Sequence, residues 1–409
     1  MSLPERLQLI VDRMTGQFPW YAHNLASQLT SKGPPSALEQ LPLVNASMLE
    51  AHYYSADNRL ALRTDLYKYQ TSGTSSGRRK AIYYTERDEE EYVRIKLDVF
   101  RAVLGSEVYR SALADMGTGH AEATAVDVFR RLGMEVESIS FRSPIEQHIE
   151  KLSAFRPEVL YTMPSILDRI LLASEDPAAY GIRRVVLVGE IASPGWRSQT
   201  AKRLGIDARD ITDTYGSIEI GTIAYYSHEH ERYLFAEGII AEGVSAESIG
   251  DGLEPLSDPE EQVLVLTSEV REAFPALRYV TYDVVRDLRP ITVDGRLQQS
   301  FQSIVKRIGP DLKHGEKISI YDIEDVVYRH LQQAAVRVKV AGNALCIHVH
   351  GDNVPEAVLE SIRHDVENRI PEIGMMIQAG ILGGIQVIGE SFDDAVHRSS
   401  VKNKKISYE

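Results

Sequence analysis

Regular alternation of strand and helix signals restricts the fold of this chain more than any other feature. Between residues 81 and 215, short apolar stretches of strand character are separated by stretches in which apolar residues recur at helical spacing. Residues 184–188 form one continuous apolar strand. Such alternation predicts a mainly parallel sheet that is covered by helices.

The pattern changes near Phe235, where turns rich in glycine and aspartate separate shorter strands and indicate a small β-rich subdomain. The strands predicted there are 233–240, 262–267, 278–282 and 298–305. A chain of 409 residues is also too long for one ordinary core. We therefore predict the α/β class, with a large N-terminal domain over residues 1–305 and a compact α+β domain over residues 306–409.

Composition excludes several classes of protein. The net charge of −14 argues against a general binder of nucleic acids or anionic membranes. The single cysteine, Cys346, excludes an intrachain disulfide and a cysteine-rich zinc site. The first 17 residues predict an amphipathic helix rather than a signal peptide, and the apolar stretch 375–388 is too short to span a bilayer. We expect a cytoplasmic enzyme or binding protein, as a monomer or homodimer.

A glycine-rich loop lies directly before the first predicted strand of the alternating region. Residues 71–80 contain five hydroxyl side chains, two glycines and three cations. Glycines let backbone N–H groups turn toward an anion, so this composition suits a polyphosphate. The glycine spacing differs from that of a Walker A loop and disfavours a P-loop NTPase. A flexible polar surface turn is the alternative interpretation.

Three further segments place polar or aromatic residues after predicted strands, where parallel sheets bind ligands. Gly189 would let a planar ring approach the backbone. Tyr215 offers an aromatic face to a base, Ser217 can donate to a phosphate, and Glu219 is a hard oxygen ligand suited to Mg²⁺. Asp283 could accept both hydroxyls of a ribose. Each segment alone is also an ordinary strand-end turn, so only their combination is informative.

The last residues place Lys402, Lys404 and Lys405 at the end of an acidic chain. Charge patterning alone favours a solvated basic tail. The alternative is a mobile lysine that enters an anionic site and offsets charge developing on a phosphate.

In this order, the segments resemble the adenylate-forming ligase superfamily, which includes acyl-CoA synthetases, and its phenylacetate-CoA ligase and capsular-type short ligase branch. The resemblance covers roughly residues 67–323, plus a weaker tail. It implies that ATP and Mg²⁺ serve to convert a small carboxylic acid into an acyl-adenylate with release of pyrophosphate. The acyl group then passes to CoA or another thiol, including a carrier protein. It also implies that residues 306–409 form a mobile lid.

The resemblance assigns roles residue by residue. It implies that Glu219 is a catalytic residue and the metal ligand, with Lys317 and Lys405 as further catalytic residues. The nucleotide-binding residues would be Thr71, Ser72, Gly73, Thr74, Gly77, Lys80, Gly189, Glu190, Asp213, Tyr215, Gly216, Ser217, Asp283 and Arg307. The acyl pocket would be lined by Met116, Gly117, Gly119, His120, Tyr161, Met163 and Ala192.

The chain departs from the superfamily pattern in three places. The hinge segment contains Pro310 and a shifted acid. The segment ending at Lys317 resembles an element of acyl-amide synthetases, so an amine acceptor stays open. Asn403 stands where the superfamily has glycine, which leaves Lys404 as an alternative to Lys405.

The mixed apolar pocket favours an aromatic or otherwise compact acid. His120 would contact this acid or lie in the core. A rival mechanism would transfer the acyl group through Cys346, although the alternating strand around this residue predicts a packing role. A second rival is a degenerate, non-catalytic nucleotide or acyl-group binder, which the altered hinge and tail support.

Overall fold

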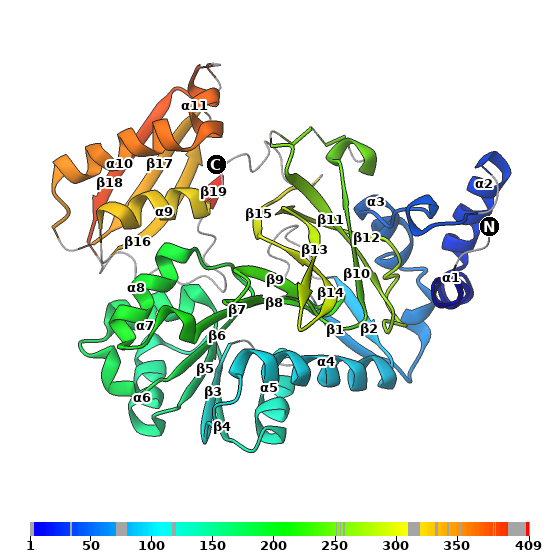
Figure 1. The fold of residues 1–409 in the computed structure, drawn as a ribbon, viewed down its shortest axis with the longest axis horizontal. Coiled ribbons are helices and arrows are strands. Elements are labelled where there is room, and N and C mark those ends of the chain that lie inside the picture. Colours follow the sequence, from blue (N-terminus) through cyan, green and yellow to red (C-terminus); the bar gives the residue numbers. More distant parts are fainter. Residues whose placement is uncertain are drawn as a thin grey trace. The chain divides into compact units, whose positions relative to one another are not determined.

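The computed structural model describes residues 4–32, 35–70, 80–116, 120–250, 252–253, 255–256, 258–309, 320–331, 334–341, 343–351, 353–378, 380, 382–391 and 406–408. The chain divides into two compact units, and each unit is built from two separate segments. The first comprises Met1–Ala102 and Tyr215–Glu316, and the second comprises Val103–Thr214 and Lys317–Glu409. Figure 1 labels the elements along the chain.

Parallel strands form the centre of the second unit. They lie in the order β7-β6-β5-β3-β4, and their bounds are Ile211–Ser217, Arg184–Val188, Val159–Thr162, Ser111–Asp115 and Glu135–Ile139. Helices alternate with these strands: α5 (His120–Arg131), α6 (Ile145–Phe155), α7 (Pro164–Ala173) and α8 (Pro194–Leu204). One buried apolar cluster joins strand and helix side chains, among them Leu160, Leu187, Leu152 and Trp196. The predicted parallel, helix-covered sheet is therefore confirmed.

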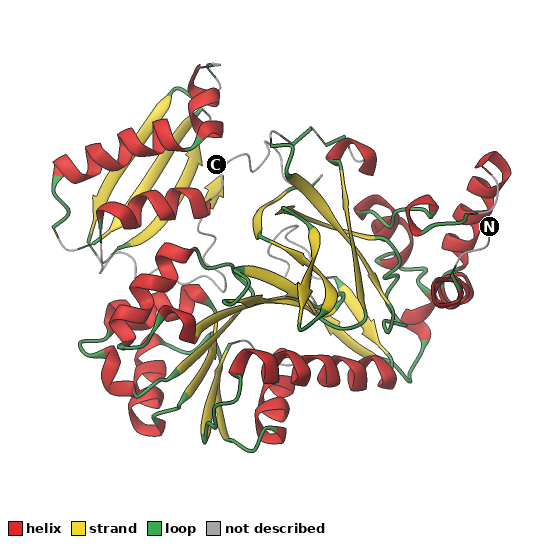
Figure 2. Cartoon of the chain, viewed as in Figure 1, coloured by secondary structure: helices red, strands yellow, loops and turns green. Residues whose placement is uncertain are grey.

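The second unit also contains the C-terminal elements. These are α9 (Ile320–His330), β16 (Ala335–Ala341), β17 (Ala344–His350), α10 (Glu356–Arg369), α11 (Pro371–Gln378), β18 (Gly384–Glu390) and β19 (Ile406–Tyr408). The sheet order is β18-β17-β16-β19, and Figure 2 shows α9 and α10 together on one face of the sheet. Helix α9 packs on α8, where the Gly195 N–H donates to the Asp325 carboxylate at 3.3 Å.

Antiparallel strands dominate the first unit. One run has the order β8-β9-β14-β13, with bounds Gly221–Ser227, Arg232–Phe235, Arg296–Phe301 and Arg289–Val293. A second sheet has the order β10-β11-β12-β15, with bounds Ile239–Val244, Glu261–Ser268, Tyr279–Arg286 and Ser303–Arg307. A third pairs β1 (Tyr67–Gln70) with β2 (Ala81–Tyr84). The β-rich subdomain predicted after residue 235 is thus present.

Helices of the first unit are α1 (Glu5–Gln17), α2 (Pro19–Lys32), α3 (Ala46–Met48) and α4 (Glu86–Leu104), the last of which ends just beyond the boundary of the unit. A capping box starts α4: the Asp88 N–H donates to the Thr85 hydroxyl at 3.0 Å, and the Thr85 N–H donates to the Asp88 carboxylate at 2.9 Å. Ile95 and Val99 are buried at helical spacing. None of the described helices is long and apolar enough to cross a membrane.

Two predicted strands are wrong in their extent. The prediction 233–240 covers two strands, β9 and β10, which are separated at Gly238 with φ of +80°. The prediction 298–305 covers β14 and β15, which belong to different sheets. An alternating apolar pattern continues through a bend, so it cannot reveal where a chain leaves one sheet for another. The predicted domain boundary at residue 306 falls within β15, and this boundary stays a prediction.

A buried lysine lies on α4. Lys96 is only 2% exposed, and its ammonium lies 5.6 Å from the ring centroids of both Tyr92 and Phe100. Burial lowers the pKa of Lys96 to about 7, because an apolar environment disfavours the charged form.

Replacing Lys96 by methionine should stabilise the protein most near neutral pH. Between about pH 7 and the ordinary lysine value of about 10.4, the unfolded chain binds the extra proton. The free energy of unfolding of the parent should therefore rise with pH across this window, by up to about 1.4 kcal/mol per pH unit from this group. Urea unfolding at pH 7, 8 and 9 measures the rise, which Lys96→Met should lack. The exposed Lys202→Met is the control, and a gain in Lys96→Met that does not change with pH would contradict the assignment.

Candidate active site

A phenol, a carboxylate and a guanidinium meet in the first unit. The Tyr215 hydroxyl donates to Asp283 Oδ2 at 2.5 Å, and Arg307 Nη1 lies 3.8 Å from Asp283 Oδ1. Asp283 and Arg307 are register partners in the pairing of β12 with β15. Burial, and then the Asp283 carboxylate, raise the pKa of Tyr215 well above its ordinary value, so the phenol stays a donor. The Arg307 side chain is 54% exposed, which keeps this group open to a ligand.

The turn that carries Glu219 joins β7 to β8, and it is defined by a close backbone approach and a hydrogen bond. A Cβ on Gly216 would lie 2.7 Å from the Gly221 carbonyl oxygen, so the position admits only glycine. The Ser217 hydroxyl accepts the Ile220 N–H at 3.3 Å. Ser217 therefore supports the turn through a hydrogen bond of its own.

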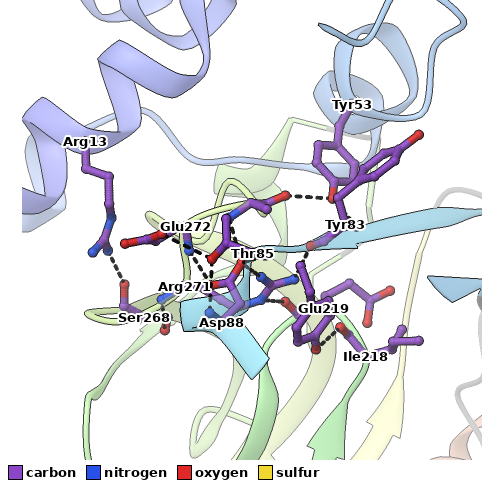
Figure 3. Close-up of polar contacts among 12 residues, drawn as sticks. Arg13, Tyr53, Tyr83, Thr85, Asp88, Ile218, Glu219, Ser268, Arg271 and Glu272 are labelled. Atoms are coloured by element: carbon purple, nitrogen blue, oxygen red, sulfur yellow. Dashed lines mark hydrogen bonds and ion pairs between the residues drawn. The ribbon is translucent and has the colours of Figure 1, made fainter. Parts of the chain in front are cut away.

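Two side chains hold the backbone of this turn, and Figure 3 shows one of them, Arg271, beside Glu219. The Tyr84 hydroxyl donates to the Ile218 carbonyl at 2.6 Å, and Arg271 Nε donates to the Glu219 carbonyl at 2.9 Å. Among the described residues, no hydrogen bond or ion pair involves the Glu219 carboxylate, which is half-buried. A fixed backbone with an uncommitted carboxylate is the arrangement that a metal ligand needs.

Two tyrosines near Glu219 were absent from the residues expected from the sequence. Burial, and then the Glu219 carboxylate, raise the pKa values of both Tyr54 and Tyr279. The Lys80 ammonium lies 4.7 Å from the centroid of the Tyr54 ring and 2.5 Å from Glu50 Oε1. No sequence signal could have selected these two from the 20 tyrosines of the chain.

In the second unit, predicted acyl-pocket residues gather at the carboxyl ends of β5 and β6. Tyr161 and Met163 are buried at the end of β5, and Ala192 lies in the same apolar cluster as Met163. Gly189 has φ of +78°, and a Cβ there would lie 3.6 Å from the Met163 sulfur. His120 is the first residue of α5, and its carbonyl accepts the Thr124 hydroxyl at 2.8 Å.

Glu190 caps a helix. Its carboxylate accepts the Ser165 N–H at 2.9 Å and the Ser165 hydroxyl at 2.8 Å, at the N-terminus of α7. The Glu190 side chain is thus committed within the protein, because the N–H groups and the dipole of a helix N-terminus stabilise a carboxylate. Asp213 is buried on β7, opposite Leu187 of β6.

The remaining predicted site residues lie outside the described part of the chain. They are Thr71, Ser72, Gly73, Thr74, Gly77, Gly117, Gly119, Lys317 and Lys405. Their roles stay predictions, as do those of the described candidates.

The chain is 37% identical to the fumarate–(S)-2,3-diaminopropanoate ligase of Enterobacter agglomerans over 381 residues, which cover 93% of this chain and 94% of that protein. This chain belongs to the adenylate-forming ligase superfamily. Residues 313–393 of this ligase match the family described as the fumarate–diaminopropanoate ligase C-terminal domain.

Two more distant similarities agree with this membership. The ligase is 25% identical to the phenylacetate-coenzyme A ligase of Thermus thermophilus over 298 residues, which cover 68% of this chain and 64% of that protein. It shares its fold with 2-hydroxyisobutyryl-CoA ligase in the postadenylation state in complex with R3-HIB-AMP, with a TM-score of 0.75 and 15% identity. That match covers 99% of this chain and 88% of the other. The predicted superfamily and α/β fold class, with its small C-terminal domain, are therefore confirmed.

Replacing Gly216 by alanine should weaken ATP binding by the ligase at least about tenfold, since the new methyl group would force the Glu219 turn away from the Gly221 carbonyl. Isothermal titration calorimetry with Mg²⁺ and ATP measures the effect. Gly16→Ala on α1 is the matched control, because a Cβ at that position would have no heavy atom within 4 Å. ATP binding by Gly216→Ala at the parental affinity would contradict this assignment.

Proposed function

We propose that this ligase joins a small dicarboxylic acid to an amino group of a diamino acid through an acyl-adenylate, in the cytoplasm. The observation that carries the proposal is the 37% identity over 93% of the chain to a ligase named for fumarate and 2,3-diaminopropanoate. Superfamily membership accounts for the adenylation, and the identities of the acid and of the amine acceptor are the proposed part.

Asp283 is suited to hold the ribose of ATP. A carboxylate offers about four lone-pair sites, and the Tyr215 hydroxyl uses one of them. The other sites can accept ribose hydroxyls, while Arg307 beside Asp283 supplies a donor and a positive charge. We assign the β- and γ-phosphates to Thr71, Ser72, Gly73, Thr74, Gly77 and Lys80.

Glu219 fits a magnesium ion, because its carboxylate has no partner among the described residues and its turn is fixed from two sides. When bound, Mg²⁺ would neutralise charge on the phosphate oxygens. Lys405, with Lys404 as the alternative, would oppose charge on the α-phosphate, and we propose a role for Lys317 in transfer to the amine.

The reaction has two steps. A carboxylate oxygen of the acid attacks the α-phosphorus of ATP, the bond to the β-phosphate breaks, and pyrophosphate leaves. The amine nitrogen then attacks the acyl carbon, the bond to AMP breaks, and the nitrogen loses a proton. Positioning and electrostatic stabilisation supply most of the rate in such transfers. The C-terminal family match over residues 313–393 supports residues 306–409 as the lid domain.

The acyl-pocket candidates support a compact acid. Tyr161 is 2% exposed and its ring contacts Phe129 edge-on, at 6.1 Å between centroids. Met163 and Ala192 pack in one buried cluster. Side chains packed in this way favour a short acid such as fumarate over a large aromatic acid.

A thiol acceptor is the second candidate. The similarity to phenylacetate-coenzyme A ligase supports it, although that similarity is lower and covers less of the chain. CoA, and after it a carrier protein, is the acceptor that this candidate implies.

Exchange of labelled pyrophosphate into ATP tests the first step. We expect fumarate to support exchange at least about tenfold faster than phenylacetate, since one misfitting methylene already costs a comparable factor. Product analysis with 2,3-diaminopropanoate and with CoA then tests the acceptor, and we expect the amide. A thioester as the efficient product would support the thiol acceptor instead of the amine. The absence of exchange with any acid would refute both candidate functions.

Replacing Glu219 by glutamine should lower the exchange rate about a hundredfold and weaken its dependence on Mg²⁺, because an amide is a poorer ligand than a carboxylate. Glu229→Gln, which alters an exposed glutamate in the turn between β8 and β9, is the control and should match the parent. Undiminished exchange in Glu219→Gln would overturn the metal assignment.

A further inference from the structure

We propose that Arg271 is a positioning residue, which holds the Glu219 turn in the geometry that binds the metal–nucleotide complex. The inference rests on the proposed role of Glu219 in the proposed function. It concerns a buried residue that lies outside every segment selected from the sequence.

Arg271 connects three elements. It is 4% exposed. Its Nε donates to the Glu219 carbonyl, and its Nη2 donates to the Tyr83 carbonyl in β2, both at 2.9 Å. Its Nη1 lies 2.5 Å from Asp88 Oδ2 on α4. A planar guanidinium can serve three acceptors in fixed directions, which a lysine ammonium on a flexible stem cannot do.

Asp88 holds the guanidinium in place. Its carboxylate accepts the N–H groups of Glu272 at 2.7 Å, Ala273 at 3.0 Å and Thr85 at 2.9 Å. The residues that follow Arg271 and the first turn of α4 are therefore attached to one carboxylate, as Figure 3 shows. Since the ion pair is buried and the Asp88 carboxylate is itself held by three backbone N–H groups, the arginine has little freedom to rotate away from the turn.

Tyr84 adds a second support. The Arg271 guanidinium carbon lies 3.7 Å from the centroid of the Tyr84 ring, and the hydroxyl of the same ring donates to the Ile218 carbonyl. Two consecutive carbonyls, those of Ile218 and Glu219, are thus held by two stacked side chains. The contacts with Tyr83 and Asp88 would suffice for a purely structural arginine. The bond from Nε to the Glu219 carbonyl links this buried pair directly to the backbone of the candidate metal ligand.

The Arg271→Lys variant tests the proposal. Its affinity for Mn²⁺ in the presence of a non-hydrolysable ATP analogue is measured by electron paramagnetic resonance. The lysine keeps the charge opposite Asp88 but cannot also serve both carbonyls. We expect the Kd for Mn²⁺ to rise about tenfold, as for loss of other groups that orient metal ligands. Tyr84→Phe, which removes the bond to the Ile218 carbonyl, should shift the Kd in the same direction by a smaller factor.

Arg278→Lys is the matched control. Arg278 is 6% exposed, donates to the carbonyls of Glu39 and Leu41, and pairs with the Glu242 carboxylate. None of its hydrogen bonds or ion pairs within the described part of the chain reaches the Glu219 turn. This variant should bind Mn²⁺ like the parent, whereas an equal loss in Arg278→Lys would mean that any buried arginine has this effect.

The double variant Glu219→Gln with Arg271→Lys separates positioning from a general loss of structure. If Arg271 acts through Glu219, its substitution should have no further effect on the Kd in the Glu219→Gln background. Parental Mn²⁺ binding by Arg271→Lys, or an undiminished effect in that background, would overturn the inference. A parent that binds Mn²⁺ but shows no exchange with any acid would instead refute the proposed function, and the comparison of variants would still decide the role of Arg271.

Discussion

The ion pair between Asp88 and Arg271 is the interaction on which the first unit most depends. The buried Asp88 carboxylate, at the start of α4, accepts a backbone N–H from the residue after Arg271. The Arg271 guanidinium opposite it donates to carbonyls in β2 and in the turn after β7. Neither charge could be buried alone without a large desolvation penalty. Helix α4, strand β2 and the turn that carries Glu219 therefore have to assemble together, and the ion pair makes their relative positions mutually dependent.

Much of the fold could be predicted because its signals are local. Apolar periodicity marked the strands and helices of the parallel sheet, and Thr85 and Asp88 stand at the sequence spacing of a capping box, which the structure contains. The same spacing could not reveal that the Asp88 carboxylate also pairs with Arg271, because 183 positions separate the two residues. Local patterns likewise failed at residues 233–240, where the chain leaves one sheet for another within a single alternating stretch.

The candidate site shows the same division. Residue chemistry at strand ends selected Tyr215 and Asp283, and their hydroxyl–carboxylate contact brings together positions 68 apart in the sequence. Glu190 was selected with its glycine as part of a nucleotide-binding turn, yet its carboxylate is used to cap α7. Tyr54 and Tyr279 escaped selection because nothing in their local sequence reports the approach of Glu219. Side-chain chemistry can be read from the sequence, but the partner of each group depends on the folded chain.

The interleaving of the two units affects how the nascent chain can fold on the ribosome. The N-terminal segment Met1–Ala102 packs on partners beyond Tyr215, as when the Tyr53 hydroxyl donates to the Ala273 carbonyl. Residues 103–214 are synthesised in between, and their parallel strands can pair with one another before the rest of the first unit has been made. At typical rates of translation, the first segment must keep its apolar surfaces unpaired for on the order of ten seconds. That interval is when molecular chaperones would find the most exposed hydrophobic surface on this protein.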